Sequence, residues 1–124
     1  MELYFKCEGY SNTPYLLEFR TTGGNEVGKP SLYIQSNGQA VFWHNGSNRV
    51  ISNGTITLRK WTHIAFVRHS GTTKMYIDGV AQSSTYSDSN DYGDGGKPLM
   101  IGRRRTQSSP VSYTHLTLPT TGVV

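Results

Sequence analysis

Apolar and polar residues alternate along this chain in short runs, and glycine, asparagine and serine separate one run from the next. The clearest pattern lies in residues 61–79, WTHIAFVRHSGTTKMYIDG. Ile64 and Phe66 point to one face of a strand at residues 62–68, and the apolar residues Ala65 and Val67 point to the other face. Because both faces are apolar, we expect this strand to be buried on both sides. Trp61 at its start is expected to bury a large apolar area in the core or at the rim.

A polar turn follows this strand and leads into a second one. Residues 69–72 supply the turn and include a glycine that can take a positive φ. Residues 74–77 then alternate in the way typical of a strand with one solvent-exposed face. The dipeptide Asp78-Gly79 is a strong hairpin signal and connects to a third strand at residues 80–84. Together these segments predict a three-stranded antiparallel meander.

The same alternation predicts strands over much of the chain. They are residues 3–7, 15–20, 31–35, 39–44, 50–51, 55–58 and 98–102, with tight turns at 36–38, 45–48 and 52–54. No segment has the roughly 3.6-residue apolar period of an amphipathic helix. At 124 residues the chain is long enough for one domain, so we expect an all-β sandwich or barrel.

The net charge of +4 raises the question of nucleic-acid binding. The basic residues are scattered, apart from the short runs at 59–60 and 103–105, so we expect no nucleic-acid surface. No stretch approaches the roughly 20 apolar residues of a membrane span, so we expect no membrane insertion. Cys7 is the only cysteine and alternates with Leu3 and Phe5, which predicts a buried thiol without an intrachain disulfide.

The end of the chain differs from the rest. Residues 110–124 contain no Asp, Glu, Lys or Arg, and all charged residues (12 basic and 8 acidic) precede position 106. Residues 111–121, VSYTHLTLPTT, resemble the translation of a transposase-type sequencing adaptor, and a genuine strand with alternating Thr and Leu is the alternative. We therefore expect residues 1–109 to form the domain and residues 110–124 to be a non-native or disordered tail.

Several segments of residues 31–102 resemble the laminin G-like domain of the concanavalin A-like jelly-roll superfamily. They are residues 32–43, WTHIAFVR at 61–68, KMYIDG at 74–79 and LMIG at 99–102, and residues 3–7 resemble an early strand of the same family. The resemblance implies an antiparallel jelly-roll β-sandwich in a protein that is extracellular or on a virion surface. Family members usually have a further strand on either side of these segments, so we expect the domain to be incomplete at both ends.

Glycosidases share the jelly-roll fold, and a catalytic member places two carboxylates at alternate positions of one strand. The acidic residues here are Glu2, Glu8, Glu18, Glu26, Asp78, Asp88, Asp91 and Asp94, and they form no E-x-D-x-E arrangement. The sequence also lacks a Gly-x-Ser-x-Gly elbow and a phosphate-binding loop. We therefore expect that the protein is not an enzyme.

The acidic loop at residues 87–96, SDSNDYGDGG, is the best candidate for a metal site. Its hard oxygen donors are Asp88, Asn90, Asp91 and Asp94. Such donors in a glycine-rich segment suit Ca²⁺, which makes this ion a candidate cofactor. A solvated loop without metal explains the same composition, and an aromatic residue occupies one donor position of the EF-hand spacing.

A second candidate site lies at the end of the fourth predicted strand. Aromatic and amide side chains at a sandwich rim can stack on a sugar and hydrogen-bond to it, and Trp43, His44 and Asn45 offer both kinds. Tyr92 in the acidic loop is a further candidate ligand-binding side chain. Trp43 alternates with Val41, so a role in the core is the competing interpretation.

Three functions are compatible with the resemblance and with the missing catalytic set. The first is a non-catalytic recognition or adhesion module that binds a glycan or a protein ligand on a surface or viral-fibre-type protein. The second is a purely structural sandwich domain of a larger fibre or multidomain surface protein. The third is a fragment of a glycoside hydrolase whose acidic pair lies outside residues 1–124.

Overall fold

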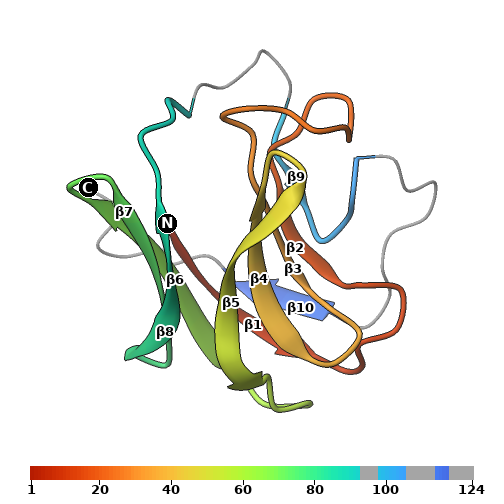
Figure 1. Ribbon diagram of the computed structural model, residues 1–124. Helices are drawn as coiled ribbons and strands as arrows, with labels where there is room; N and C mark the ends of the chain where they lie inside the picture. Colours follow the sequence, from red (N-terminus) through yellow and green to blue (C-terminus); the bar gives the residue numbers. More distant parts are fainter. Residues whose placement is uncertain (93–97, 106–113, 118–124) are drawn as a thin grey trace.

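The computed structural model describes residues 1–92, 98–105 and 114–117, the last four through their backbone. In this part of the chain the secondary structure consists of ten β-strands (Figure 1). They are β1 (Glu2–Cys7), β2 (Tyr15–Glu18), β3 (Ser31–Ile34), β4 (Gln39–His44), β5 (Ser47–Thr55), β6 (Thr62–His69), β7 (Thr72–Ile77), β8 (Val80–Ser87), β9 (Met100–Ile101) and β10 (Thr114–Thr117). The all-β class expected from the sequence is confirmed.

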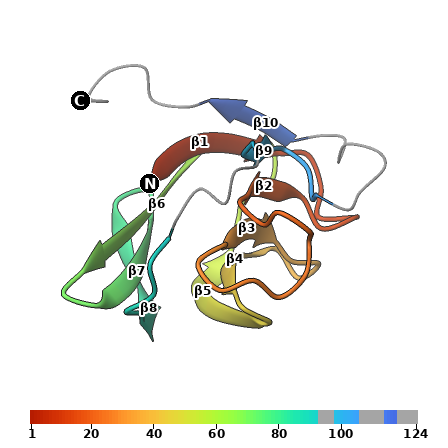
Figure 2. The same cartoon turned by 90° about the horizontal axis from the view of Figure 1, so that it is seen from above.

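The described strands form two antiparallel sheets that lie against each other (Figure 2). The β1 sheet has the order β10-β1-β6-β7-β8, and the β2 sheet has the order β5-β4-β3-β2-β9. Because β1 pairs with β6 rather than with β2, the connection after β1 crosses from one sheet to the other. Two layers joined in this way make a sandwich, so the predicted antiparallel β-sandwich is confirmed.

One face of each sheet supplies the hydrophobic core. Leu3, Phe5 and Cys7 of β1 are buried, and the residues between them point outward. The β1 sheet adds Ile64, Phe66 and Met75, and the β2 sheet contributes Leu16, Leu17, Leu32, Ile34, Ala40, Phe42 and Val50. Cys7 is buried, as its alternation with Leu3 and Phe5 predicted.

Two tight hairpin turns agree with the sequence prediction. The turn between β4 and β5 consists of Asn45 and Gly46, with φ angles of 46° and 83°. The turn between β7 and β8 has φ angles of 49° at Asp78 and 80° at Gly79. Asn, Asp and Gly tolerate this left-handed region best, which explains why these dipeptides occur here. Asp78 Oδ1 also accepts a hydrogen bond from the backbone N–H of His63 (2.8 Å), which holds the turn against β6.

β5 differs from its prediction, which placed a turn at residues 52–54 between two short strands. The strand continues through this segment, and its register with β4 shifts there. Ser52 Oγ accepts a hydrogen bond from the Ala40 N–H (3.0 Å) and donates one to the Gly54 carbonyl (2.7 Å). A β-bulge accommodates extra residues without ending a strand, so residues typical of turns can lie inside a continuous strand such as β5.

The outermost strands β5 and β8 meet and close one side of the sandwich. The Ile51 N–H donates to Ser84 Oγ (3.2 Å), and the Asn53 N–H donates to Gln82 Oε1 (2.8 Å). Asn53 Oδ1 in turn accepts hydrogen bonds from the N–H (3.0 Å) and the hydroxyl (2.7 Å) of Ser83. These contacts, called the β5–β8 seam below, satisfy backbone groups that an uncovered strand edge would expose.

The outer face of β6 is exposed, so the prediction of a strand buried on both sides is wrong. Ile64 and Phe66 lie in the core, but Val67 is 48% exposed. A two-layer sandwich covers one face of each sheet, and the apolar residues of the other face contact solvent. Trp61 is also 48% exposed, and Lys6 Nζ lies 5.6 Å from the centroid of its ring. Trp61 therefore does not anchor the core.

β10 lies in the segment that the sequence assigned to a non-native or disordered tail. Its backbone pairs with β1, with Phe5 opposite Leu116. Strand pairing uses backbone amides, so a strand added to a sheet edge needs no particular sequence. Residues 114–117 form a strand. The assignment of residues 110–124 to a non-native or disordered tail and the adaptor origin of residues 111–121 stay predictions. Residues 110–113 and 118–124 lie outside the described residues.

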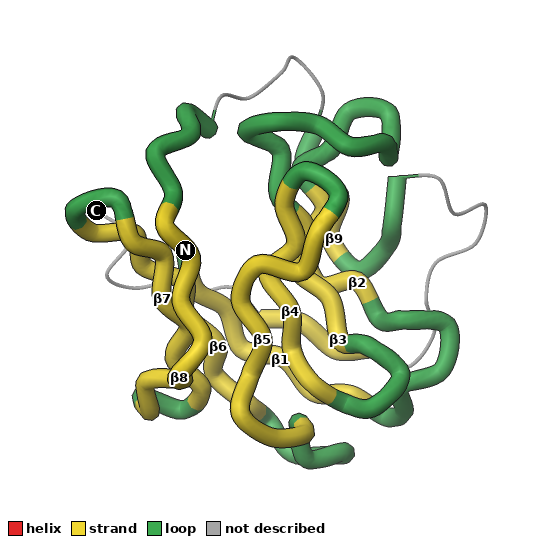
Figure 3. Tube along the Cα trace, viewed as in Figure 1, coloured by secondary structure: helices red, strands yellow, loops and turns green. Residues whose placement is uncertain are grey.

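Three loops gather at one end of the sandwich (Figure 3). They are residues 19–30 between β2 and β3, the β4–β5 turn at residues 45–46, and residues 88–92 after β8. We call this end the rim. The loop between β1 and β2 lies at the opposite end (Figure 1).

Candidate functional site

Close backbone contacts hold the rim loops together. Gly28 has a φ of +73°, and a Cβ at this position would lie 2.3 Å from the carbonyl oxygen of Asp91. Only glycine allows the two loops to approach this closely. A Cβ at Gly46 would meet the side-chain amide of Asn25 at 3.1 Å, so the β2–β3 loop also contacts the β4–β5 turn. The three loops therefore form one continuous surface.

His44, the last residue of β4, anchors the β2–β3 loop. Its side chain is buried, and Nε2 accepts a hydrogen bond from the Gly28 N–H (2.8 Å). Since Nε2 accepts, the neutral ring carries its proton on Nδ1, which lies 3.2 Å from the Tyr86 hydroxyl. Burial lowers the pKa of His44, an effect that Asp88 opposes and Arg49 reinforces. His44 is thus held in the neutral form in which it can accept the Gly28 bond.

Asp88 anchors the loop after β8. Its carboxylate is buried, and Oδ1 accepts hydrogen bonds from the backbone N–H (3.0 Å) and the side-chain amide (2.9 Å) of Asn90. Oδ2 accepts one from the Tyr92 hydroxyl and one from the Thr73 hydroxyl (3.4 Å). Arg68 Nη1 lies 3.7 Å from Oδ1. Burial alone would raise the pKa of Asp88, but these hydrogen bonds and the charge of Arg68 lower it below its usual value.

This arrangement bears on the predicted calcium site. Donor groups already surround both oxygens of Asp88, and Asn90 turns its amide nitrogen, which does not bind metals, toward the same carboxylate. Within residues 1–92 and 98–105, no three His, Cys, Asp or Glu side chains are placed to hold a metal ion. Asp91 is exposed, and Asp94 lies outside the described residues. The Ca²⁺ site stays a prediction, and in this structure Asp88 and Asn90 lock the loop instead.

A cavity of about 530 Å³ opens between the two sheets beside this cluster. Phe19, Pro30, Phe42, Phe66 and Leu99 make its walls largely apolar, and Arg68, Thr73 and Tyr92 supply polar groups. The rings of Phe42 and Phe66 come from opposite sheets, and their centroids lie 5.3 Å apart. Small-molecule sites in proteins typically have volumes of roughly 300–1,000 Å³, so this cavity is of ligand-binding size.

The structure brings together two of the four predicted ligand-binding residues. His44 and Tyr92 meet edge to face, with ring centroids 5.4 Å apart. Trp43 points to the other face of the β2 sheet because successive strand residues alternate, and it lies against Arg20 there. Asn45 is exposed in the hairpin turn. The four side chains therefore do not form one surface.

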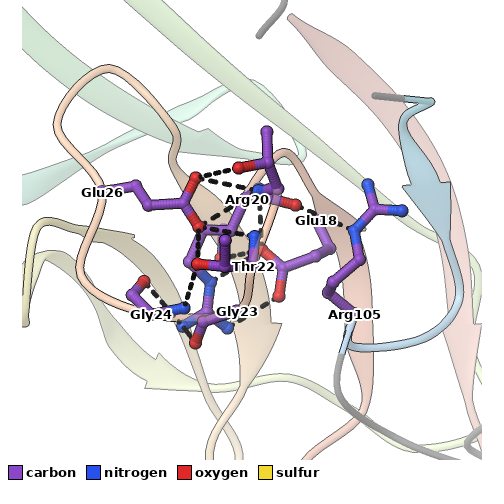
Figure 4. Close-up of polar contacts among 9 residues, drawn as sticks. Glu18, Arg20, Thr22, Gly23, Gly24, Glu26 and Arg105 are labelled. Carbon is purple, nitrogen blue, oxygen red and sulfur yellow. Dashed lines mark hydrogen bonds and ion pairs between the residues drawn. The ribbon is translucent and has the colours of Figure 1, made fainter. Parts of the chain in front are cut away.

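A buried ion pair that was not expected from the sequence lies on the outer face of the β2 sheet (Figure 4). Arg20 Nη2 is 2.6 Å from Glu18 Oε2, and Arg20 Nε donates to Glu18 Oε1 (2.9 Å). Ser31 donates to the same Oε1 (2.5 Å), and the guanidinium lies 4.6 Å from the centroid of the Trp43 ring. Burial raises the pKa of Glu18, but the hydrogen bonds from Arg20 and Ser31 outweigh it, so the pKa is lowered. Opposite charges two positions apart on a strand share one face, so the spacing of Glu18 and Arg20 could have predicted this ion pair from the sequence.

Glu26 orders the loop that follows this ion pair. Its carboxylate accepts hydrogen bonds from the N–H groups and the hydroxyls of Thr21 and Thr22, at 2.6 to 3.1 Å (Figure 4). Burial opposes ionisation, yet these bonds lower the pKa of Glu26 to about 2. Arg20 Nη1 also donates to the Gly23 carbonyl (2.7 Å), so the ion pair and the loop form one unit.

Comparison with known proteins identifies the family. A laminin G family model, described as the concanavalin A-like lectin/glucanases superfamily, matches residues 1–113. The chain belongs to this family. The match confirms the resemblance seen in residues 31–102 and extends it on both sides.

A solved structure supports the same fold for this laminin G-like domain. The chain is similar to domains LG4-5 of the mouse laminin alpha1 chain, with a TM-score of 0.52 and 21% sequence identity. The similarity covers 93% of this chain and 32% of that chain, so the domain spans about a third of the matched structure. At this identity the match shows the fold alone. No curated protein matches the sequence significantly.

The superfamily includes glucanases, so the acidic residues of the laminin G-like domain matter for its chemistry. Glycosidases need one carboxylic acid whose pKa is raised, so that it can donate a proton. Glu18, Glu26 and Asp88 each have a lowered pKa and are surrounded by hydrogen-bond donors. These three carboxylates are therefore suited to anchoring loops. No helix in the described part of the chain is long and apolar enough to cross a membrane.

Proposed function

We propose that this laminin G-like domain is a non-catalytic recognition module that binds a glycan or a protein ligand at an extracellular or virion surface. One observation carries the proposal: the ionisable side chains of His44, Asp88 and Glu26 each accept a hydrogen bond from a backbone N–H group of a rim loop and so hold that loop in place. Loops fixed on a rigid sandwich are well suited to recognition, because binding then costs little conformational entropy.

The exposed part of the rim offers suitable contact groups. Asn25, Asn45 and Asp91 are exposed and come from the three different loops. The loops approach one another at Gly28 and Gly46, so these side chains belong to one continuous surface. Amide and carboxylate groups hydrogen-bond equally well to sugar hydroxyls and to peptide groups. The chemistry of the surface therefore supports either ligand class.

The proposal is tested with the full chain on a glycan array and against a panel of extracellular matrix proteins. Two variants probe the rim: Asn45→Gly, which removes an amide but keeps the left-handed turn, and Asp91→Ala. Each lost hydrogen bond is expected to weaken binding by about tenfold. Asn12→Gly is the matched control, because Asn12 also has a positive φ (61°) and belongs to the β1–β2 loop rather than to a rim loop.

Three outcomes contradict the proposal. A chain that binds no glycan and no protein favours a purely structural domain. A ligand whose affinity is unchanged in both rim variants binds elsewhere on the domain. Release of reducing sugar from an arrayed glycan would show catalysis and would contradict the proposal that the module is non-catalytic.

A further inference from the structure

The cavity between the sheets lies beside the exposed rim surface, and Gly28 and Tyr92 of the rim loops line part of it. Its volume of about 530 Å³ lies within the range of small-ligand sites, and its walls come from both sheets. Phe42 belongs to β4 and Phe66 to β6, and Tyr92 lies with its ring centroid 6.4 Å from that of Phe42. A ligand in the cavity would therefore meet aromatic and aliphatic surface from both sheets.

The polar groups of the lining are mostly committed to protein partners. The hydroxyls of Thr73 and Tyr92 donate to Asp88. Sugar hydroxyls need several hydrogen-bond partners when they leave water, and this lining does not supply them. The cavity is therefore suited to an apolar body and unsuited to a sugar ring.

Arg68 is a lining residue with donor groups still available. Its Nη1 donates to the Asn90 carbonyl and lies 3.7 Å from Asp88 Oδ1, and its guanidinium lies 5.0 Å from the centroid of the Tyr92 ring. These contacts hold the side chain in place. Among the described residues, no hydrogen-bond partner engages Nε or Nη2 of Arg68, and the side chain is 38% exposed. A fixed guanidinium with two available donor groups matches a carboxylate.

We propose that this cavity binds a small monocarboxylate with an aliphatic or aromatic body, whose carboxylate pairs with Arg68 while the body lies against the wall formed by Phe42 and Phe66. The apolar walls provide affinity for the body, and the arginine selects the anionic head. Asn25, Asn45 and Asp91 of the recognition surface proposed above do not line the cavity, so different variants test the two proposals and either can fail without the other. Binding is non-covalent and requires no cofactor.

The first experiment titrates the full chain with octanoate, decanoate and dodecanoate below their micelle concentrations, using isothermal titration calorimetry. Affinity is expected to rise about fourfold with each added methylene, as long as the added methylene contacts the apolar wall of the cavity. This factor corresponds to roughly 0.8 kcal/mol per buried CH₂. Octan-1-ol has the same chain as octanoate without the charge. It is expected to bind at least about tenfold more weakly, because it lacks the charge-assisted hydrogen bonds.

Two variants separate the head from the body. Arg68→Met keeps the apolar stem of the side chain and is expected to weaken octanoate binding by about 10- to 100-fold, with little effect on octan-1-ol. Leu99→Trp enlarges an apolar wall residue and is expected to weaken both ligands. Arg59→Met is the control, because the Arg59 side chain is 76% exposed and pairs with Glu8. Circular dichroism and thermal unfolding verify that each variant is folded.

The proposal is overturned if folded wild-type protein binds none of the three carboxylates at millimolar concentration. It is equally overturned if octanoate and octan-1-ol bind alike, since Arg68 would then play no part. Unchanged octanoate affinity in folded Leu99→Trp and Arg68→Met would place binding outside the cavity and overturn it as well. None of these results depends on whether the rim binds a glycan or a protein.

Discussion

Replacing Arg20 by Met would break the buried ion pair on the outer face of the β2 sheet. The Glu18 side chain is fully buried and the Arg20 side chain is 4% exposed, so water cannot replace the lost partner. Glu18 would keep the Ser31 hydroxyl as a donor but lose the guanidinium. The carbonyl of Gly23 would lose a donor as well. Arg20→Met therefore leaves a buried carboxylate without its counter-charge.

The expected cost is about 3–5 kcal/mol, the range for removing one member of a buried pair. Domains of this size have a total stability of about 5–15 kcal/mol, so the variant is expected to be folded but weakened. With an m-value of about 2 kcal/mol/M, the urea midpoint would fall by roughly 2 M. Arg59→Met is the control, because its side chain is 76% exposed and pairs with Glu8 at 3.5 Å. Such surface pairs contribute about 0–1 kcal/mol.

The assay is urea unfolding followed by far-UV circular dichroism, since Trp43 fluorescence would respond directly to the loss of Arg20. The double variant Glu18→Gln/Arg20→Met removes both charges and is expected to lose less than the sum of its single variants. A midpoint for Arg20→Met equal to that of Arg59→Met would refute the reasoning. Strict additivity in the double variant would show that the two charges do not depend on each other.

Three further predictions address the rim and the core. The pKa of His44 is lowered in the folded state from its ordinary value of 6.5. As the pH falls below that value, the unfolded chain therefore binds more protons than the folded chain. Stability should therefore fall as the pH drops from 7 to 5, and thermal unfolding of His44→Gln should show a smaller fall; equal slopes would exclude the effect. Gly28→Ala should cost at least about 1 kcal/mol because φ is +73° and the Asp91 oxygen blocks the Cβ, whereas a Cβ at Gly54 has open space, so Gly54→Ala should cost less. Met75→Ala should cost about 2–5 kcal/mol in urea unfolding, because Met75 is fully buried, while the exposed Val67→Ala should stay within about 0.5 kcal/mol; similar values would contradict the assigned core.

Most of the fold was predictable because the apolar alternation and the turn dipeptides act locally. Asn45 and Asp78 adopt the left-handed turns that their identity favours. β5 was not predictable in the same way. Ser52 keeps the bulged segment within the strand by accepting a hydrogen bond from the Ala40 N–H and donating one to the Gly54 carbonyl. The outer face of β6 is apolar in sequence but exposed, since no second layer covers it.

The candidate site was predictable only in part. The sequence grouped Trp43 with His44 by adjacency, although neighbours on a strand point to opposite faces, and this rule alone could have separated them. The pairing of His44 with Gly28 depends on loops brought together by the fold, and no local pattern signals it. Arg68 was absent from the predicted site because its position beside Asp88 depends on the packing of β6 against the loop after β8.

The β5–β8 seam has a consequence for the dynamics of the domain. It joins residues only 29 to 33 positions apart, whereas β1 pairs Leu3 with Ile64. Contacts close in sequence form at a lower entropic cost, so we expect residues 39–87 to fold as a unit before β1 joins it. Ile51 and Asn53 lie on the outermost strand of their sheet, where amide hydrogens usually exchange quickly with solvent. Because both amides donate across the seam, they are expected to exchange as slowly as those of an interior strand.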